Sequence, residues 1–309
     1  MSNTRLLLVG VLILCAATIL ALSGCPAPSG SGPSSEGGAP PPAASTATGT
    51  TISQLGSTTV LPIAEKWATA YHAKNPQANI NVTGGGSGAG IKALIGKTCD
   101  LADSSRAIKP EEIKSGQAAG VTPKELKIAY DGIAIIVNPA CTLKEISIEK
   151  LSDAFTGKIK DWKDLGGSAG AIQLVNRESS SGTYDSFKEM VVTLGGKAKE
   201  RDFAPNALSQ TSSEGVLTTV AGTKTAIGYV GLGYVNSTVK VLAVIPLGGG
   251  KPAILPSAET VRAKTYPISR ELYVYTNGEP TGILKAYLDW AVGPEGQRLV
   301  KEAGYVPLT

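Results

Sequence analysis

Three turns rich in glycine and hydroxyl side chains are the segments of this sequence best suited to chemistry. They span residues 56–62, 84–90 and 176–183, and each follows a predicted strand and precedes a predicted helix. A helix N-terminus carries unsatisfied N–H donors and about half a positive charge, so it attracts anions. The third turn adds Arg177, whose guanidinium fits a tetrahedral oxyanion through two parallel hydrogen bonds. One such turn is commonly a plain helix cap, but three of them with an arginine favour an oxyanion site.

Motifs of phosphate-hydrolysing and ester-hydrolysing enzymes fail on spacing. Residues 96–98 (Gly-Lys-Thr) end like a P-loop, but residue 91, where its first glycine is required, is isoleucine. Residues 85–89 (Gly-Gly-Ser-Gly-Ala) resemble a nucleophile elbow but end in alanine. His72 is the only histidine, and we expect it on the surface at the end of an amphipathic helix. The sequence therefore predicts no histidine metal site, no cofactor and no imidazole base.

Length and composition indicate about two globular domains in 309 residues. Hydrophobic residues make up 42% of the chain and charged residues 17%, so a core can be buried. The 29 Lys and Arg against 25 Asp and Glu leave a net charge of +4. This excess is too small to indicate a nucleic-acid partner.

The N-terminal segment predicts a lipoprotein signal. Arg5 precedes a nearly all-apolar run over residues 6–22, and Leu-Ser-Gly-Cys at 22–25 resembles a bacterial lipobox. We expect cleavage after a 1–24 signal peptide and a lipid on Cys25, the alternative being an uncleaved membrane anchor. Residues 25–50 then form the anchor and a flexible linker, since 26–50 hold 24 Pro, Ala, Gly, Ser or Thr. The mature chain is expected outside the cytoplasm, anchored to a bacterial membrane.

Two cysteines remain in the mature chain besides Cys25. Outside the cytoplasm, Cys99 and Cys141 either form a disulfide or stay as two small buried thiols. A disulfide between them would contribute roughly 4 kcal/mol in the chain-entropy model.

The elements that position the turns alternate between strand and helix from residue 51 onward. Strands are predicted at 51–55, 79–82, 101–103, 131–138, 172–175, 226–230, 239–245 and 271–275. Helices are predicted at 64–73, 91–97, 110–118, 147–155, 183–194, 213–221, 282–291 and 295–303. This alternation predicts an α/β fold with a parallel or mixed sheet. Ligands of such sheets bind beyond the carboxyl ends of the strands, where these turns lie.

At these turns the sequence resembles the phosphate-binding lipoproteins and periplasmic proteins of bacterial ABC phosphate importers. The resemblance covers about residues 51–309 and is carried by 56–62, 84–92, 100–106, 155–162, 177–183 and 227–231. It implies a type II periplasmic-binding-protein fold, with two α/β lobes joined by two crossover strands and a ligand cleft between them. The crossovers would lie near 130–131 and 267–272. One lobe would be 51–130 plus 268–309, and the other 131–267.

The resemblance also implies which residues bind inorganic phosphate. They are Ser57, Thr58, Thr59, Ser87, Ser104 and Ser105 from one lobe and Arg177, Ser181, Gly182 and Thr183 from the other. Arg106 would either form a salt bridge or reach the anion. Some members place an aspartate where this chain has Ser105. That aspartate accepts the proton of bound phosphate and repels sulfate.

The implied function is a monomeric, non-enzymatic receptor that delivers phosphate to an ABC permease in the membrane. Three alternatives stay open at this point. The ligand could be sulfate, molybdate or a phosphonate, because Ser105 replaces the discriminating aspartate. The chain could be a secreted phosphatase or esterase that uses Ser87 or Ser181. It could also be a surface adhesin or a sensor on the same fold.

Overall fold

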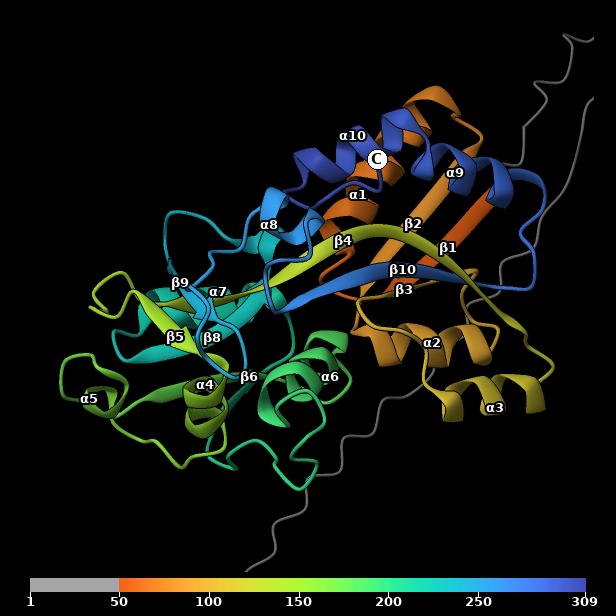
Figure 1. The fold of residues 1–309 in the computed structure, drawn as a ribbon. Coiled ribbons are helices and arrows are strands. Elements are labelled where there is room, and N and C mark those ends of the chain that lie inside the picture. Colours follow the sequence, from red (N-terminus) through yellow and green to blue (C-terminus); the bar gives the residue numbers. More distant parts are fainter. Residues whose placement is uncertain (1–49) are drawn as a thin grey trace, which may run out of the picture. The chain divides into compact units, whose positions relative to one another are not determined.

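Two long strands carry the chain between its two halves. In the computed structural model, which describes residues 50–309, β4 (Pro123–Val137) and β10 (Ser269–Asn277) pair antiparallel from Gly132↔Ser269 to Pro123↔Asn277. Beyond the segment that pairs with β10, the rest of β4 pairs antiparallel with β8 and β9. We call residues 51–130 plus 268–309 lobe I and residues 131–267 lobe II. Figure 1 shows both strands running from one lobe to the other.

Lobe I has a mixed sheet with helices on both faces. Its strand order is β2-β1-β3-β10-β4, in which β1 pairs parallel with β2 and β3. Its further strands are β1 (Thr50–Gly56), β2 (Ala78–Gly84) and β3 (Leu101–Ser104). Its helices are α1 (Leu61–Lys74), α2 (Ser87–Ile95), α3 (Pro110–Ala118), α9 (Gly282–Val292) and α10 (Pro294–Glu302). Helices α1, α9 and α10 cover one face and α2 and α3 the other (Figure 1).

Lobe II repeats this arrangement around the far half of β4. The strand path is β4-β8-β6-β7, and β9 pairs with β4 and β5. Its strands are β5 (Glu145–Ser147), β6 (Gln173–Arg177), β7 (Leu208–Gln210), β8 (Ala226–Gly231) and β9 (Lys240–Ile245). Its helices are α4 (Ile148–Phe155), α5 (Trp162–Leu165), α6 (Gly182–Phe187), α7 (Ser213–Gly222) and α8 (Ala258–Arg262), with a π-helical turn at Lys188–Val192 and a 3₁₀ turn at Leu232–Tyr234.

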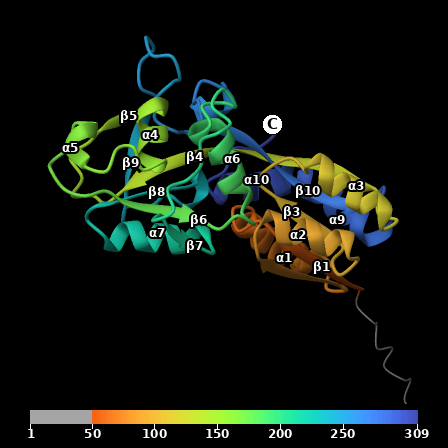
Figure 2. The same cartoon turned by 90° about the horizontal axis from the view of Figure 1, so that it is seen from below.

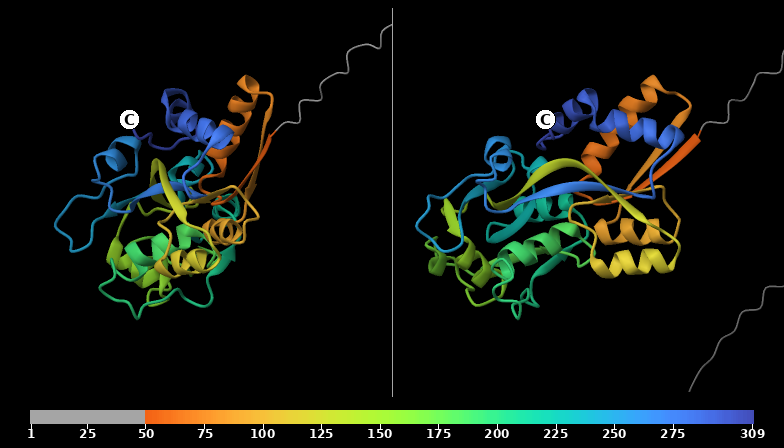
Figure 3. Two further views of the ribbon diagram at one scale, coloured as in Figure 1. Left: turned by 90° about the vertical axis from the view of Figure 1, so that its right-hand side faces the viewer. Right: turned by 45° about the vertical axis from the view of Figure 1, so that its right-hand side comes forward.

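Each lobe has its own apolar core. Lobe I centres on Trp67 and Tyr71 of α1 and Tyr287 of α9, which are all buried. In lobe II the rings of Phe187 and Tyr229 stack with centroids 3.9 Å apart. Burial of such aromatic side chains contributes strongly to core stability. Figure 3 shows the crossing strands between the two lobes from two further sides.

The structure differs from the predicted elements in one long strand and in several short segments. Strand β4 begins at Pro123, eight residues before the strand predicted at 131–138, and β5 was not predicted. The helix predicted at 183–194 is α6 followed by a π-helical turn, and the short elements α5, α8 and β7 were not predicted. Three- to five-residue elements hold too few residues to show a period. The lobe boundaries at 130 and 267 stay a prediction. The signal peptide and Cys25 lie outside the described residues, as does the linker up to residue 49.

The predicted alternative of a Cys99–Cys141 disulfide is wrong for this structure. Both cysteines are free thiols. Cys99 packs in the lobe I cluster with Leu94 and Tyr275, whereas Cys141 packs against the core of lobe II. Burial, with Asp100 and Asp103 nearby, raises the pKa of the Cys99 thiol to about 11. Within residues 50–309, no helix has both the length and the apolar character needed to cross a membrane.

Candidate anion-binding site

The three predicted turns meet where the two lobes face each other. Gly56 accepts hydrogen bonds through its carbonyl from the N–H groups of Gly85 and Gly86, at 2.8 and 2.9 Å, and this joins the first two turns. The third turn arrives from lobe II, because the N–H of Gly88 donates to the carbonyl of Ser180 at 2.9 Å. Figure 1 and Figure 2 show α6 beside one end of α2. The tertiary fold thus joins turns that are more than 90 residues apart in sequence.

Hydroxyl groups from both lobes lie in contact at this junction. The hydroxyls of Thr59 and Thr183 are 2.9 Å apart, and each residue is 1% exposed. On the lobe I side, the hydroxyl of Ser87 lies 3.3 Å from that of Ser105 and accepts a hydrogen bond from the N–H of Ser105. Together with the buried Thr58, these residues form a polar cluster between the lobes, which we call the hydroxyl cluster.

A fourth helix N-terminus also contributes, and the sequence did not single it out. Ser213 is the first residue of α7, and its hydroxyl lies 3.4 Å from that of Thr58. The polarity of this end of α7 matches that of the three predicted turns. The Ser212-Ser213 pair before an apolar helix was the available signal.

Gly182 is required by close approach between the lobes. A Cβ built on Gly182 would lie 2.6 Å from the hydroxyl oxygen of Ser105 and closer still to that of Ser87. Gly86 is constrained differently, because its φ of +89° is in the region that favours glycine. Both glycines therefore let the second and third turns touch.

Arg177 is buried at the end of β6 and is held by lobe II. Its guanidinium donates to the carbonyls of Gln210 and Thr211 and to the hydroxyl of Ser213, each at 3.2 Å. The residue is 2% exposed. Burial lowers the pKa of the guanidinium, and the nearby charge of Arg270 acts in the same direction. A bound anion would offset that cost, since an opposite charge favours the protonated form.

Arg270 is a site residue that sequence reasoning missed. It lies on β10 directly opposite Asp131 on β4, and two of its nitrogens donate to one Asp131 oxygen, at 2.8 and 3.0 Å. The same guanidinium reaches the hydroxyls of Thr59 at 3.3 Å and Thr183 at 3.1 Å. The sequence signal was a charged residue directly before the strand predicted at 271–275, and in the structure this residue belongs to the mostly buried strand β10.

Three predicted ligands use their hydroxyls to cap turns. Ser57 accepts from the N–H groups of residues 59 and 60, and Ser181 from those of residues 183 and 184. Ser104 donates to the carbonyl of Arg106 at 2.7 Å. These three serines shape the turns, whereas Thr58, Thr59, Ser87, Ser105 and Thr183 form the cluster itself.

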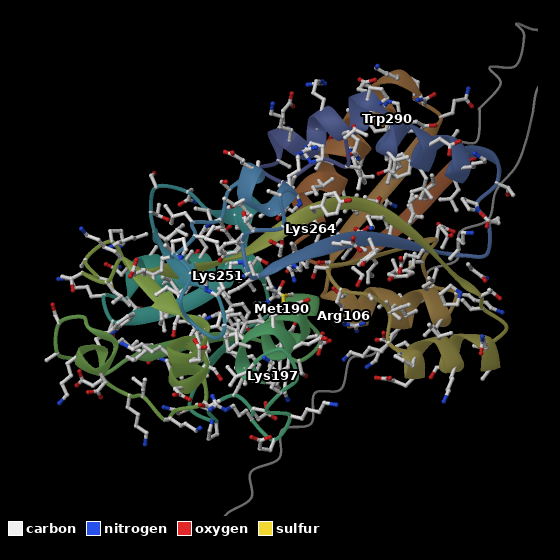
Figure 4. The ribbon with its side chains drawn as sticks, in the orientation of Figure 1. Arg106, Met190, Lys197, Lys251, Lys264 and Trp290 are labelled. Carbon is white, nitrogen blue, oxygen red and sulfur yellow. The ribbon has the colours of Figure 1, made fainter. Side chains whose placement is uncertain are left out.

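Two neighbouring charged residues do not point into the cluster. The carboxylate of Asp103 accepts a hydrogen bond from Gln54 at 2.8 Å, and burial raises its pKa to about 7. Arg106 forms the salt bridge that was one of its two predicted roles, with Glu112 at 2.8 Å and with Asp185 of lobe II at 2.7 Å. Figure 4 shows Arg106 between α6 and the pair α2 and α3. Arg106 therefore links the two lobes beside the cluster.

The protein has a two-lobed α/β fold with crossing strands, and a buried cluster of polar side chains lies between its lobes. This arrangement is that of a solute-binding protein. Residues 41–295 match the family model described as a PBP superfamily domain. The phosphate-binding protein PstS of Borreliella burgdorferi is 32% identical over 258 residues, covering 82% of this chain and 89% of its own. That of Bacillus subtilis is 34% identical, covering 82% and 79%. The chain therefore belongs to the PBP superfamily, in the family of the PstS phosphate-binding proteins.

Solved structures agree with this assignment. A substrate-binding protein of a phosphate ABC transporter from Clostridium perfringens, solved with bound phosphate, superposes with a TM-score of 0.75 at 33% identity. The match covers 84% of this chain and 100% of that one. A phosphate transport receptor from Vibrio cholerae gives a TM-score of 0.64 at 30% identity, covering 82% and 99%. The expectation of a type II periplasmic-binding-protein fold is confirmed.

Proposed function

We propose that this protein captures inorganic phosphate between its lobes, outside the cytoplasm, and delivers it to an ABC permease. The observation that carries the proposal is the buried hydroxyl cluster, which both lobes build together with two arginines. Its donor set suits a tetrahedral oxyanion. The relatives named above as phosphate-binding proteins support inorganic phosphate as that oxyanion.

The proposed ligands come from both lobes. Lobe I offers Thr58, Thr59, Ser87 and Ser105, and lobe II offers Arg177, Gly182 and Thr183, with Ser57, Ser104 and Ser181 shaping their turns. A hydrogen bond to a charged group contributes about 1.5–3 kcal/mol, so several are needed to offset the loss of hydration of a divalent anion. Since neither lobe has enough donors alone, phosphate binding should hold the lobes together.

A hydrolase role for Ser87 or Ser181 is disfavoured by their partners. The hydroxyl of Ser87 contacts Ser105, and that of Ser181 caps α6. His72 is on the exposed end of α1, where its ring contacts the carbonyl of Ala78. Neither serine has an adjacent base in the described part of the chain, and a serine nucleophile requires one. We therefore propose binding without catalysis.

We further propose that the protein acts as a monomer tethered by a lipid on Cys25. The Leu-Ser-Gly-Cys sequence at 22–25 supports the lipid, and the linker that follows is long enough to span about 25–30 Å. Cys25→Ala should release the protein from the membrane fraction into the medium or periplasm. Equal retention by wild type and variant would contradict the lipid anchor.

Calorimetric titration tests the proposed ligand. The chain from residue 25 with Cys25→Ala would be unfolded and refolded to strip carried-over anion, then titrated with phosphate, sulfate, molybdate and a phosphonate. Tight phosphate binding with no sulfate heat is expected. Preference for another oxyanion would replace phosphate as the ligand, and silence for all four would favour an adhesin or sensor.

Arg177→Ala tests the site. We expect strong loss of phosphate affinity, because Arg177 carries charge into the cluster and holds Ser213. The matched control is Arg201→Ala, which removes a partly buried arginine whose bonds to Ser152 and Asp153 stay within lobe II. Unchanged affinity in Arg177→Ala would remove Arg177 from the site. A chromogenic phosphomonoester, assayed in parallel with Ser87→Ala, would reveal any hydrolysis.

A further inference from the structure

The buried ion pair of Arg270 and Asp131 joins the crossing strands to the hydroxyl cluster. The Arg270 side chain is 4% exposed and that of Asp131 is fully buried. One guanidinium nitrogen, Nη2, contacts Asp131, Thr59 of lobe I and Thr183 of lobe II together. Arg270 thus reaches the two threonines whose hydroxyls meet across the lobe junction.

Within residues 50–309, the other terminal nitrogen of Arg270 has no hydrogen-bond partner. Among the described residues, Nη1 is a buried donor that makes no hydrogen bond. All three nitrogens of the Arg177 guanidinium, in contrast, already bond to lobe II groups. A buried charged donor without an acceptor is costly, and folded proteins nearly always satisfy such groups. The orphaned donor belongs to the guanidinium that contacts Thr59 and Thr183 through Nη2, and it therefore points to a ligand acceptor.

We propose that Arg270 is a second guanidinium ligand, which donates through Nη1 to an oxygen of the bound phosphate; this inference rests on the proposed function. Asp131 is then its counter-ion in the ligand-free protein, and it fixes the direction of the guanidinium through two hydrogen bonds. Because Arg270 lies on β10, the crossover strand itself contributes a side chain that binds the phosphate.

The charges around Arg270 suit a dianion. Arg177 and Asp131 are charged groups that interact with Arg270, and the phenols of Tyr229 and Tyr305 are also near it. Burial raises the pKa of both phenols, so they stay neutral at physiological pH. Two guanidinium groups face a single carboxyl group, and burial raises the pKa of that Asp131 carboxyl, so the three buried groups together carry net positive charge that attracts an anion.

Three variants of the pair, titrated with phosphate, test the inference. Arg270→Gln should weaken phosphate binding about 10- to 100-fold, as expected for one lost hydrogen bond to a charged group. Asp131→Asn keeps the guanidinium and should bind at least as tightly as wild type. The double variant replaces the ion pair by a neutral, hydrogen-bonding pair, and it should stay as weak as Arg270→Gln.

The double variant separates a ligand from a purely structural arginine. If Arg270 only neutralises Asp131, the double variant should recover wild-type affinity, and that result would overturn the inference. The double variant can also be titrated if Arg270→Gln alone does not fold, because it leaves no unpaired buried charge. If wild type binds phosphate and the double variant binds it equally well, only this inference is overturned. If wild type does not bind phosphate, the proposed function is overturned as well.

A crystal structure of the wild-type phosphate complex separates direct contact from positioning of the two threonines. Nη1 within about 3.2 Å of a phosphate oxygen supports the inference. A phosphate that contacts Thr59 and Thr183 but leaves Nη1 beyond hydrogen-bond distance would reduce Arg270 to a positioning residue and overturn it.

Discussion

Gly182→Ala offers a sharp test of how the lobes meet, because it adds a single methyl group at their contact. Gly182 is the first residue of α6, and its φ is not in the left-handed region, so alanine fits the backbone of lobe II. In the closed arrangement, however, the new methyl group would lie 2.6 Å from the Ser105 hydroxyl oxygen and closer to that of Ser87. Relief requires either separating the lobes or turning both serines away from the ligand.

The expected loss of phosphate affinity follows from the steric cost of the added methyl group. Overpacking by one methyl group in a close-packed setting costs about 1–3 kcal/mol, which corresponds to about 5- to 150-fold weaker phosphate binding. Stability without phosphate should barely change, since the clash exists only when the lobes are together. Calorimetric titration gives the affinity, and thermal unfolding with and without phosphate gives the two stabilities.

The matched control is Gly222→Ala. Gly222 is the last residue of α7 and has open space around its Cβ position. Alanine there should leave phosphate affinity unchanged and raise stability slightly, by about 0.5–1 kcal/mol. Wild-type phosphate affinity in Gly182→Ala would refute the contact between the second and third turns. An equal loss of stability without phosphate would instead show that the lobes already touch in the ligand-free protein, which would refute the expected dependence on phosphate.

Three further predictions concern charged groups around the cluster. Asp185→Asn removes the pairing with Arg106 across the lobes. Because this ion pair is partly exposed, the variant should weaken phosphate binding only about 5-fold, and less at high salt. The control Asp153→Asn, which removes ion pairs within lobe II, should leave phosphate binding unchanged, and equal effects of the two variants would contradict a link between the lobes. Ser105→Asp should sharpen phosphate over sulfate in competition titrations, because a carboxylate accepts the proton of hydrogen phosphate and repels sulfate; equal loss of both anions would show that aspartate does not fit. Because the pKa of Asp103 is raised to about 7 in the fold, its protonated form is favoured there, and stability falls as pH rises toward and through 7. From about pH 5 to pH 8, urea unfolding should show wild type losing up to about 3 kcal/mol relative to Asp103→Asn; parallel curves for the two proteins would contradict the raised pKa.

Much of the fold could be predicted because its signals are local. Apolar runs such as Ile133–Val137 mark buried strands, and capping serines mark where helices begin. The same locality explains the failures. Short elements such as β7 and α8 lack a period, and no local pattern shows that Cys99 and Cys141 belong to different cores.

The sequence by itself determined the three turns with their helix N-termini and predicted an oxyanion site from them and Arg177, because each turn carries its own donors within a few residues. Only the tertiary structure decided which donors converge. It brought Thr59 and Thr183 together across the lobe junction, turned Ser57, Ser104 and Ser181 into caps, and added Ser213 and Arg270. Arg270 enters the cluster because β10 pairs with β4 in one register, and register between strands more than 130 residues apart is set by packing of the whole sheet.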